Sequence, residues 1–486
     1  MVVVFAATEM EPFCTTGELA DVIGALPVAI AEKGHEVVVM LPGYSLIDRE
    51  RYGFTKPGVW LQIPVGREQQ TLAISSLEWK GITVYLLEND EYFDRPTLYG
   101  NGYTDYTDNG LRFMFYSRGL IETLRALDIR PDVVHCHDWP SALVVSYLAS
   151  LYKDDPFFIN TATLFTIHRL KHQGLFHESV FWLSGLPSEL FRSHTMEHFG
   201  NVSFIKGGIV CADAVSTVSE TYAREITTRE LGFGLDELFA KKKENLYGIV
   251  NGIDMKAADP AADPLIPAHF SADDPSGKSI CREHLLKTCG LKADDNVPIF
   301  GMVSRLDDQK GIHLLEEAVD SLANLDIRLI ILGTDTREHQ ELTIQFASRH
   351  PQRIRVLLRF DKGMSRLIYA GSDIFLMPSR WEPGGLGQLV AMRYGTIPLV
   401  HKTGGLADTV RDLGEHPKDG TGFSFKEYTV FSFVEAASRA VGIFRSPHPG
   451  PWDDLIGRVM RLDHSWGISA DKYIALYERI HERRHG

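Results

Sequence analysis

Two basic side chains, Arg305 and Lys310, lie five residues apart in FGMVSRLDDQKGIHLL, residues 300–315. The apolar run before Arg305 predicts a strand, and a helix is expected to begin after Gly311. Two cations on one loop suit a diphosphate, because a guanidinium binds paired oxygens and an ammonium acts as a point charge. Taken alone, the pair is slightly better explained as two solvated side chains.

A glycine-rich stretch, LMPSRWEPGGLGQLVAMRYG at residues 376–395, supplies further context. Gly384, Gly385 and Leu386 follow an expected strand and open an expected helix, where backbone N–H groups and the helix dipole favour an anion. Glu382 beside them would repel a phosphate. We therefore expect this carboxylate to face another group, such as sugar hydroxyls.

Two more polar clusters follow apolar runs in the first half of the chain. His135, His137, Asp138 and Trp139 end the expected strand PDVV, and His168 ends FTIH. The His-x-His-Asp spacing allows a metal site, but no second motif completes one, so a polar cluster closing a strand is favoured. A lone histidine at a strand end is more often structural than catalytic. Together with the two stretches above, these make four polar clusters at the carboxyl ends of expected strands. Parallel α/β sheets bind ligands at those ends, so the four clusters together favour a functional site.

The turn within FCTTGELADVIGALP, residues 13–27, has the layout of a phosphate-binding turn but carries an acid. Thr15 and Gly17 connect an expected strand to a helix, which presents free N–H groups. Glu18 follows at the closest approach. A carboxylate about 5 Å from a phosphate would make phosphate binding less favourable by roughly 3 kcal/mol at an effective dielectric near 20. Two interpretations of Glu18 have equal weight. It is either a solvent-facing acid of the first helical turn or a residue with a function at this turn.

Short β-branched runs alternate with amphipathic helical stretches, which predicts an α/β fold with parallel sheets covered on both faces. TTGELADVIGAL near the start is echoed by KTGGLADTVRDL at residues 402–413. We expect two Rossmann-like, doubly wound parallel-sheet domains facing across a cleft. The expected segments are an N-terminal domain at 1–255, a linker at 256–278, a C-terminal domain at 279–460, and at 461–486 a terminal helix packing back on the first domain.

Composition excludes several classes of protein. The 486 residues include 64 acidic and 50 basic side chains, a net charge of −14, which disfavours a nucleic-acid or anionic-membrane partner. Five cysteines without C-x-x-C spacing indicate neither a disulfide framework nor a zinc site. No apolar run approaches the length of about 18 residues that a membrane span needs. The expectation is a cytoplasmic enzyme.

In order along the chain, these stretches resemble the bacterial starch/glycogen synthase family of retaining glycosyltransferases, which have the two-domain GT-B fold. The resemblance implies transfer of glucose from ADP-glucose to the non-reducing end of an α-1,4-glucan, with no metal or other cofactor. The matching stretches are GELADVIGALP, HCHDWPSAL, FTIHRLKHQGLF, FIKGGIVCADAVSTVSETYAREI, GIVNGID, SRLDDQKG, IYAGSDIFLMPSRWEPGGLGQL, RYGTIPLV and KTGGLADTV.

The resemblance also implies roles for individual residues. Arg305 and Lys310 would bind the departing diphosphate together with backbone N–H groups of the Gly384–Leu386 stretch, and Glu382 would hold the glucose hydroxyls. The remaining implied site residues are Asp138, Trp139 and His168 on the sugar and acceptor side, Asn251 at the donor, and Phe360, where the family usually has a tyrosine stacked on the base.

One departure from the family pattern concerns the opening turn. The family usually reads K-T-G-G-L there, with the lysine and the second glycine close to the donor phosphates, whereas this chain has Thr15 and Glu18. Our hypothesis is that Arg169 pairs with Glu18 or replaces the missing lysine charge. The alternatives are a related transferase with another donor or acceptor, or a low-activity glucan-binding homologue. The sequence leaves nucleotide preference, acceptor length and oligomeric state open.

Overall fold

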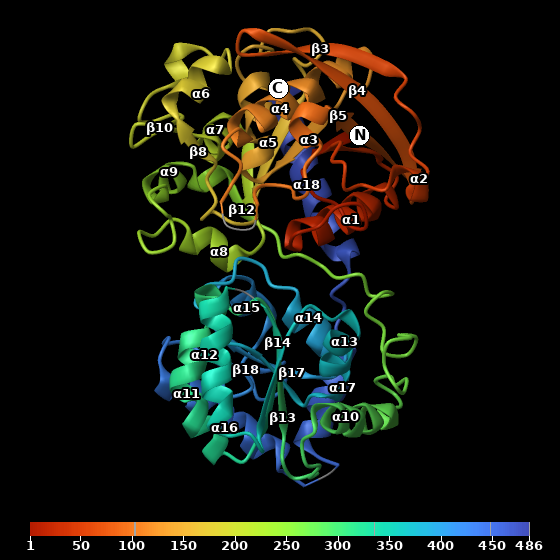
Figure 1. The fold of residues 1–486 in the computed structure, drawn as a ribbon, viewed down its shortest axis with the longest axis vertical. Coiled ribbons are helices and arrows are strands. Elements are labelled where there is room, and N and C mark those ends of the chain that lie inside the picture. Colours follow the sequence, from red (N-terminus) through yellow and green to blue (C-terminus); the bar gives the residue numbers. More distant parts are fainter. Residues whose placement is uncertain (102–103, 335, 448, 486) are drawn as a thin grey trace. The chain divides into compact units, whose positions relative to one another are not determined.

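The computed structural model describes residues 1–101, 104–334, 336–447 and 449–485. The chain forms two compact units (Figure 1). Unit 1 comprises Met1–Ile249 and Trp466–Gly486, and unit 2 comprises Val250–Ser465. The sequence places the domain ends at residues 255 and 460 instead. The expected linker, 256–278, belongs to unit 2.

Unit 1 contains a nine-stranded sheet of order β12-β11-β7-β6-β1-β2-β5-β4-β3. All neighbours are parallel except at one edge, where β4 runs antiparallel to both β5 and β3. The strands are β1 (Val2–Ala6), β2 (Glu36–Pro42), β3 (Val59–Val65), β4 (Glu68–Trp79), β5 (Ile82–Glu88), β6 (Val133–His137), β7 (Ala162–Ile167), β11 (Ala214–Thr217) and β12 (Leu246–Gly248).

A small second sheet of order β8-β10-β9 and several helices complete unit 1. The small strands are β8 (Leu175–His177), β9 (Glu197–His198) and β10 (Asn201–Ser203). The helices are α1 (Glu18–Ala31), α2 (Arg49–Tyr52), α3 (Asp90–Phe93), α4 (Asn109–Ala126), α5 (Asp138–Leu148), α6 (Glu178–Leu183), η1 (Ser188–Leu190), α7 (Phe204–Cys211), α8 (Glu220–Glu225), α9 (Asp236–Lys241), η2 (Lys243–Asn245) and α18 (Trp466–His485).

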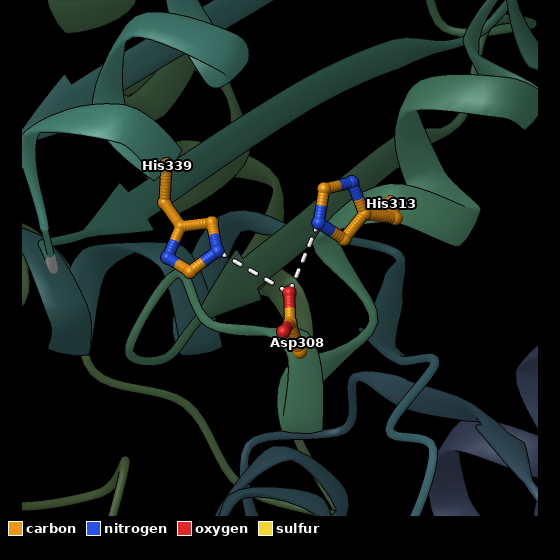
Figure 2. Close-up of side chains that lie close together, drawn as sticks. All are labelled: Asp308, His313 and His339. Atoms are coloured by element: carbon orange, nitrogen blue, oxygen red, sulfur yellow. Dashed lines mark hydrogen bonds and ion pairs between the residues drawn. The ribbon is translucent and has the colours of Figure 1, made fainter.

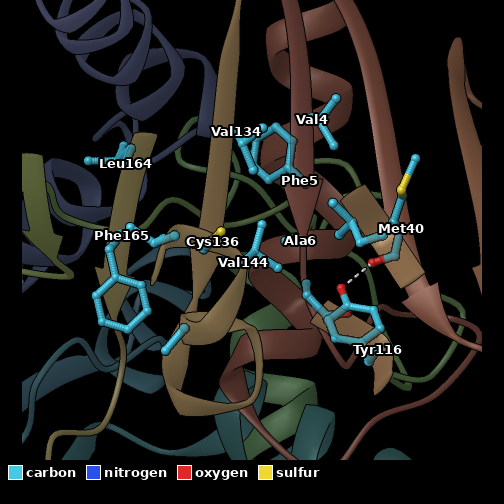
Figure 3. Close-up of a cluster of buried hydrophobic side chains, with 14 of the residues drawn as sticks. Val4, Phe5, Ala6, Met40, Tyr116, Val134, Cys136, Val144, Leu164 and Phe165 are labelled. Atoms are coloured by element: carbon cyan, nitrogen blue, oxygen red, sulfur yellow. Dashed lines mark hydrogen bonds between the residues drawn. The ribbon is translucent and has the colours of Figure 1, made fainter. Parts of the chain in front are cut away.

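The core of unit 1 lies on both faces of its central strands. Phe5 of β1, Cys136 of β6 and Phe165 of β7 are fully buried among apolar side chains (Figure 3). Continuous burial explains the unbroken apolar run of β1, because helices cover both sides of a parallel sheet. The hydroxyl of Tyr116 on α4 lies 2.7 Å from Met40 O of β2, which ties this helix to the sheet.

Helix α18 closes the chain against unit 1. Tyr473, Leu476, Tyr477 and Ile480 recur at helical spacing and are all buried in the unit 1 core. Their burial gives the C-terminal segment a structural role, because removing this apolar stripe would expose the central strands to water.

Unit 2 contains a six-stranded, all-parallel sheet of order β15-β14-β13-β16-β17-β18. The strands are β13 (Ile299–Val303), β14 (Arg328–Gly333), β15 (Ile354–Leu358), β16 (Ile374–Met377), β17 (Ile397–His401) and β18 (Phe423–Phe425). The helices are α10 (Ser276–Cys289), η3 (Asp308–Lys310), α11 (Ile312–Asn324), α12 (Arg337–Ser348), α13 (Lys362–Gly371), α14 (Gly387–Arg393), α15 (Gly404–Thr409), α16 (Val430–Phe444) and α17 (Pro451–Met460).

The order of the unit 2 strands is that of a doubly wound sheet. The chain moves outward from β13 through β14 to β15, then returns to the other side of β13 and continues through β16, β17 and β18. Helices α11, α12 and α16 lie on one face, and α10 and α13 lie on the other (Figure 1). In such sheets a crevice forms where the order reverses, outside the carboxyl ends of the two central strands.

The same reversal occurs in unit 1, between β1 and β6. Thus the loop after β1, which carries Thr15 and leads to Glu18 at the start of α1, is a neighbour of the end of β6, where Asp138 follows. In unit 2 the reversal separates the loop after β13 from the loop after β16. All four polar clusters predicted from the sequence therefore lie at or beside a switch point.

Candidate functional site

The switch point of unit 2 brings Lys310 and Glu382 into contact. Lys310 ends η3 after β13, and Glu382 follows β16, 72 residues later. Lys310 Nζ lies 2.5 Å from Glu382 Oε2, and the same carboxylate oxygen accepts a hydrogen bond of 2.9 Å from Ser379 Oγ. Glu382 is only 2% exposed, so this ion pair is shielded from solvent. Its charges attract more strongly than a surface pair would.

Asp307 is a site residue that the sequence analysis did not identify. Its Oδ1 accepts a hydrogen bond of 2.9 Å from Lys310 N, and its Oδ2 lies 2.7 Å from Arg305 Nη1. One carboxylate thus orients both predicted diphosphate-binding residues. The Arg305 side chain is 47% exposed and can reach a ligand. Asp307 is the N-cap of η3, and an aspartate directly before a helix is a capping signal that could have identified it.

The predicted glycine turn is present, but its helix begins later than expected. Leu386 is the N-cap of α14, which starts at Gly387. Gly385 has φ of +80°, a left-handed conformation that favours glycine. We therefore place Gly384, Gly385 and Leu386 in the loop before the helix.

A second glycine pair, Gly404 and Gly405 from the repeated KTGGLAD motif, packs directly on this loop. Gly405 N donates hydrogen bonds of 3.0 Å to Glu382 O and Pro383 O. A Cβ on Gly405 would lie 1.8 Å from Gly384 O, and one on Gly404 would lie 1.9 Å from Glu382 O. The repeat was noted in the sequence, but its contact with the Glu382 loop required the structure.

The switch point of unit 1 joins Asp138 to the strand end that carries His168. Asp138 Oδ1 accepts hydrogen bonds from His168 N at 2.8 Å and from Arg169 N at 3.4 Å. Asp138 has φ of +56°, an uncommon conformation for a residue with a side chain, and one that aspartate tolerates better than most. Burial of the carboxyl group raises the pKa of Asp138 to about 7.

Three histidines form a buried polar network beside Asp138. His135 Nδ1 lies 2.7 Å from Tyr477 Oη and its Nε2 lies 2.6 Å from Thr166 Oγ1, so both ring nitrogens have partners. His137 Nδ1 lies 3.0 Å from His168 Nε2. These contacts support the polar-cluster interpretation of the His-x-His-Asp motif rather than a metal site.

His168 remains neutral in this network. Burial, together with the nearby charge of Arg169, lowers the pKa of His168 to about 3. Its Nδ1 is buried without a hydrogen-bond partner among the described residues. A buried nitrogen without a partner is energetically costly, so this atom is an exception among buried polar groups.

The opening turn contains a second acid that the sequence analysis missed. Glu9 accepts hydrogen bonds from Thr16 N at 2.5 Å and Thr16 Oγ1 at 2.8 Å, and it is only 4% exposed. The Arg169 guanidinium lies at the same turn, because a Cβ on Gly17 would be 3.6 Å from Arg169 Nη2. Thr15 is exposed, and Glu18 is partly exposed. A cation therefore accompanies the acids at this turn.

The remaining predicted residues differ in their surroundings. Trp139 packs edge-on against Phe113, with ring centroids 4.9 Å apart, and is partly buried. Asn251 is 3% exposed in unit 2. Phe360 follows β15 and is 91% exposed, so its ring is free to stack on a ligand. The roles of these residues stay predictions.

A cavity of about 700 Å³ lies elsewhere in unit 1, between α8, β12 and α18. Its lining includes Arg224, Lys243, Tyr247, Lys472 and Arg479, and it contains none of the predicted site residues. The cavity is therefore separate from the predicted site residues. No helix of the described segments is long and apolar enough to cross a bilayer.

Comparison with known proteins agrees with this arrangement. Residues 2–241 match the family model "Starch synthase catalytic domain", and residues 290–441 match "Glycosyl transferases group 1". The chain is 44% identical over 480 residues to a glycogen synthase of Geotalea daltonii, with 99% of both chains covered. The chain belongs to the starch and glycogen synthase family. A glycogen synthase 2 of Geobacter sulfurreducens is 42% identical, with both chains covered completely.

Among solved structures, the catalytic domain of starch synthase IV from Arabidopsis thaliana, bound to ADP and acarbose, matches with a TM-score of 0.90 and 33% identity. The match covers 99% of each chain. The family resemblance and the expected α/β fold of GT-B type, with two Rossmann-like parallel-sheet domains, are confirmed. As a member of this family, the protein is a retaining glycosyltransferase.

Proposed function

We propose that the protein transfers glucose from ADP-glucose to the non-reducing end of an α-1,4-glucan such as glycogen, with retention at the anomeric carbon. The observation that carries this proposal is the buried Lys310–Glu382 pair, held beside Arg305 at the unit 2 switch point. Support comes from the family membership and from the starch synthase relative whose structure contains ADP and acarbose.

The reaction needs a positive environment for its leaving group. The bond between the anomeric carbon and the diphosphate oxygen breaks, a bond to the acceptor hydroxyl oxygen forms, and the acceptor proton leaves with the diphosphate. Arg305 and Lys310 would neutralise the charge that grows on the departing oxygen. Glu382 would accept hydrogen bonds from glucose hydroxyls. With these two cations in place, the proposal needs no metal or other cofactor.

The test is incubation of the purified protein with glycogen and either ADP-glucose or UDP-glucose. Release of nucleoside diphosphate and growth of the glucan are measured together, with each donor alone as the control. We expect release and growth with ADP-glucose. Release from neither donor would favour the alternatives, which are another donor or acceptor, or a glucan-binding homologue of low activity. Glu9 and Glu18 at the opening turn are the observation that favours those alternatives.

Arg169 should compensate for the lysine that is absent from the opening turn. Replacing Arg169 with alanine removes a positive charge next to Gly17. The donor KM should rise by about tenfold to a hundredfold, because a charge about 5 Å from a phosphate contributes roughly 3 kcal/mol at an effective dielectric near 20. Arg130→Ala is the matched control, because Arg130 is exposed and precedes the amino end of β6. An unchanged donor KM in the Arg169 variant would rule out compensation.

Asp138 should set the acid limb of the pH profile. Its raised pKa of about 7 means that the carboxyl is neutral below pH 7 and negative above it. Since a negative group stabilises the developing positive charge of the sugar, kcat should fall about tenfold per pH unit below 7. His168, with a pKa of about 3, should add no step between pH 5 and 9.

The Asp138→Asn variant checks this assignment. Asparagine preserves the shape of the side chain, and its kcat should be low and independent of pH across the same range. A variant profile that keeps the wild-type acid limb would assign that limb to another group.

The proposed partners are the nucleotide-sugar donor and the glucan acceptor. The proposed setting is the cytoplasm, where thiols remain reduced. The five cysteines, Cys14, Cys136, Cys211, Cys281 and Cys289, are all unpaired in the structure, which fits that setting.

A further inference from the structure

Three side chains from three helices of unit 2 converge on one point. Asp308 comes from η3, His313 from α11 and His339 from α12 (Figure 2). His313 Nε2 lies 3.0 Å and His339 Nε2 lies 3.2 Å from the same oxygen, Asp308 Oδ1. The three potential ligand atoms all lie within 4.8 Å of one another.

Two of these separations are close to those in a tetrahedral metal site. Zinc binds imidazole nitrogen and carboxylate oxygen at about 2.0–2.2 Å, which places tetrahedral ligand atoms about 3.3–3.6 Å apart. The two observed N···O distances, 3.0 and 3.2 Å, need only a small expansion to admit an ion. Figure 2 shows both rings directing one nitrogen at the carboxylate.

The surroundings of His339 orient it as a metal ligand. Its Nδ1 lies 3.1 Å from Thr336 Oγ1, the N-cap of α12. With the proton on Nδ1, the ring donates to this oxygen and presents Nε2, which lies 3.2 Å from Asp308 Oδ1, as the metal-binding atom. A hydrogen bond of this kind to the far nitrogen is the usual support of a metal-binding histidine. The His339 side chain is 17% exposed, whereas those of His313 and Asp308 are 58% and 65% exposed, so an ion can enter from solvent.

We propose that Asp308, His313 and His339 form a three-ligand site for a divalent transition metal of the zinc, cobalt and nickel group, with a fourth position open to water. Two imidazoles with one carboxylate favour these ions over magnesium or calcium, which prefer oxygen ligands. The ion would fasten α12 and α11 to η3, the segment that also contains Lys310. This proposal does not depend on the transferase function.

The test measures metal binding directly on tag-free protein stripped with a chelator. Competition against a chromophoric chelator at pH 7.5 should give one tight zinc equivalent per chain. His313→Ala and His339→Ala should each weaken it by at least about 100-fold, and Thr336→Val by about 10-fold to 100-fold. Cobalt substitution supplies a spectrum without thiolate bands, which distinguishes this site from the cysteines.

His350→Ala is the matched control. His350 Nε2 lies 2.6 Å from Asp320 Oδ1 in the same unit, but Arg349 occupies the other oxygen of that carboxylate. Its loss should leave zinc affinity unchanged. Circular dichroism of the metal-free variants checks that each is folded. Zinc bound equally well by wild type and the His313→Ala/His339→Ala double variant, or a cobalt spectrum with thiolate bands, would overturn the proposal.

Discussion

Replacing Lys310 with glutamine should lower kcat for glucosyl transfer by about 10²–10³-fold. Glutamine keeps much of the length of the side chain and a hydrogen-bond donor toward Glu382, but it removes the charge that neutralises the leaving diphosphate. The loss should fall mainly on kcat, because the leaving oxygen carries more negative charge in the transition state than in the bound donor. Steady-state kinetics with ADP-glucose and glycogen measure it.

Two further variants separate chemistry from folding in this experiment. Arg349→Gln removes an exposed cation of the same unit, which pairs with Asp320 at 2.9 Å, and should leave kcat unchanged. The double variant Lys310→Gln/Glu382→Gln should lose less than the product of the two single effects, because each residue positions the other. Wild-type kcat in folded Lys310→Gln would contradict the proposed role.

Replacing Gly405 with alanine should destabilise unit 2 by about 1–3 kcal/mol. The new Cβ would lie 1.8 Å from Gly384 O, so the backbone of the Glu382 loop must move. A displacement of about 1 Å at a catalytic loop can also cost about 100-fold in rate. Denaturant unfolding gives the change in stability, and the transferase assay gives the change in rate.

Gly442 provides the matched control for the glycine experiment. It lies within α16, where a Cβ would meet no atom within 4 Å. Gly442→Ala should therefore leave the rate unchanged and stabilise the protein by up to about 1 kcal/mol, because alanine is the better helix former. If both variants have the same unfolding midpoint in denaturant as the wild type, the packing of Gly405 on Gly384 does not hold the Glu382 loop in place.

The sequence was most informative about the ends of strands. Apolar runs located Arg305, Glu382, Asp138 and His168 at carboxyl ends because strand periodicity and turn residues are local properties of the chain. The sequence did not show that Glu9 would hold the opening turn or that Asp307 would orient Arg305. Those contacts depend on side-chain directions that neighbouring residues do not specify.

The sequence by itself determined the doubly wound sheets and the set of polar residues at their edges. Only the tertiary structure decided which loops became neighbours, because the order of strands places β13 beside β16 and so joins Lys310 to Glu382. The protonation of Asp138 and His168 was also decided there, since burial shifts a pKa and burial depends on distant elements. The hydrophobic pattern is a property of neighbouring residues in the sequence. The proximity of distant side chains and their removal from water arise only when the chain folds.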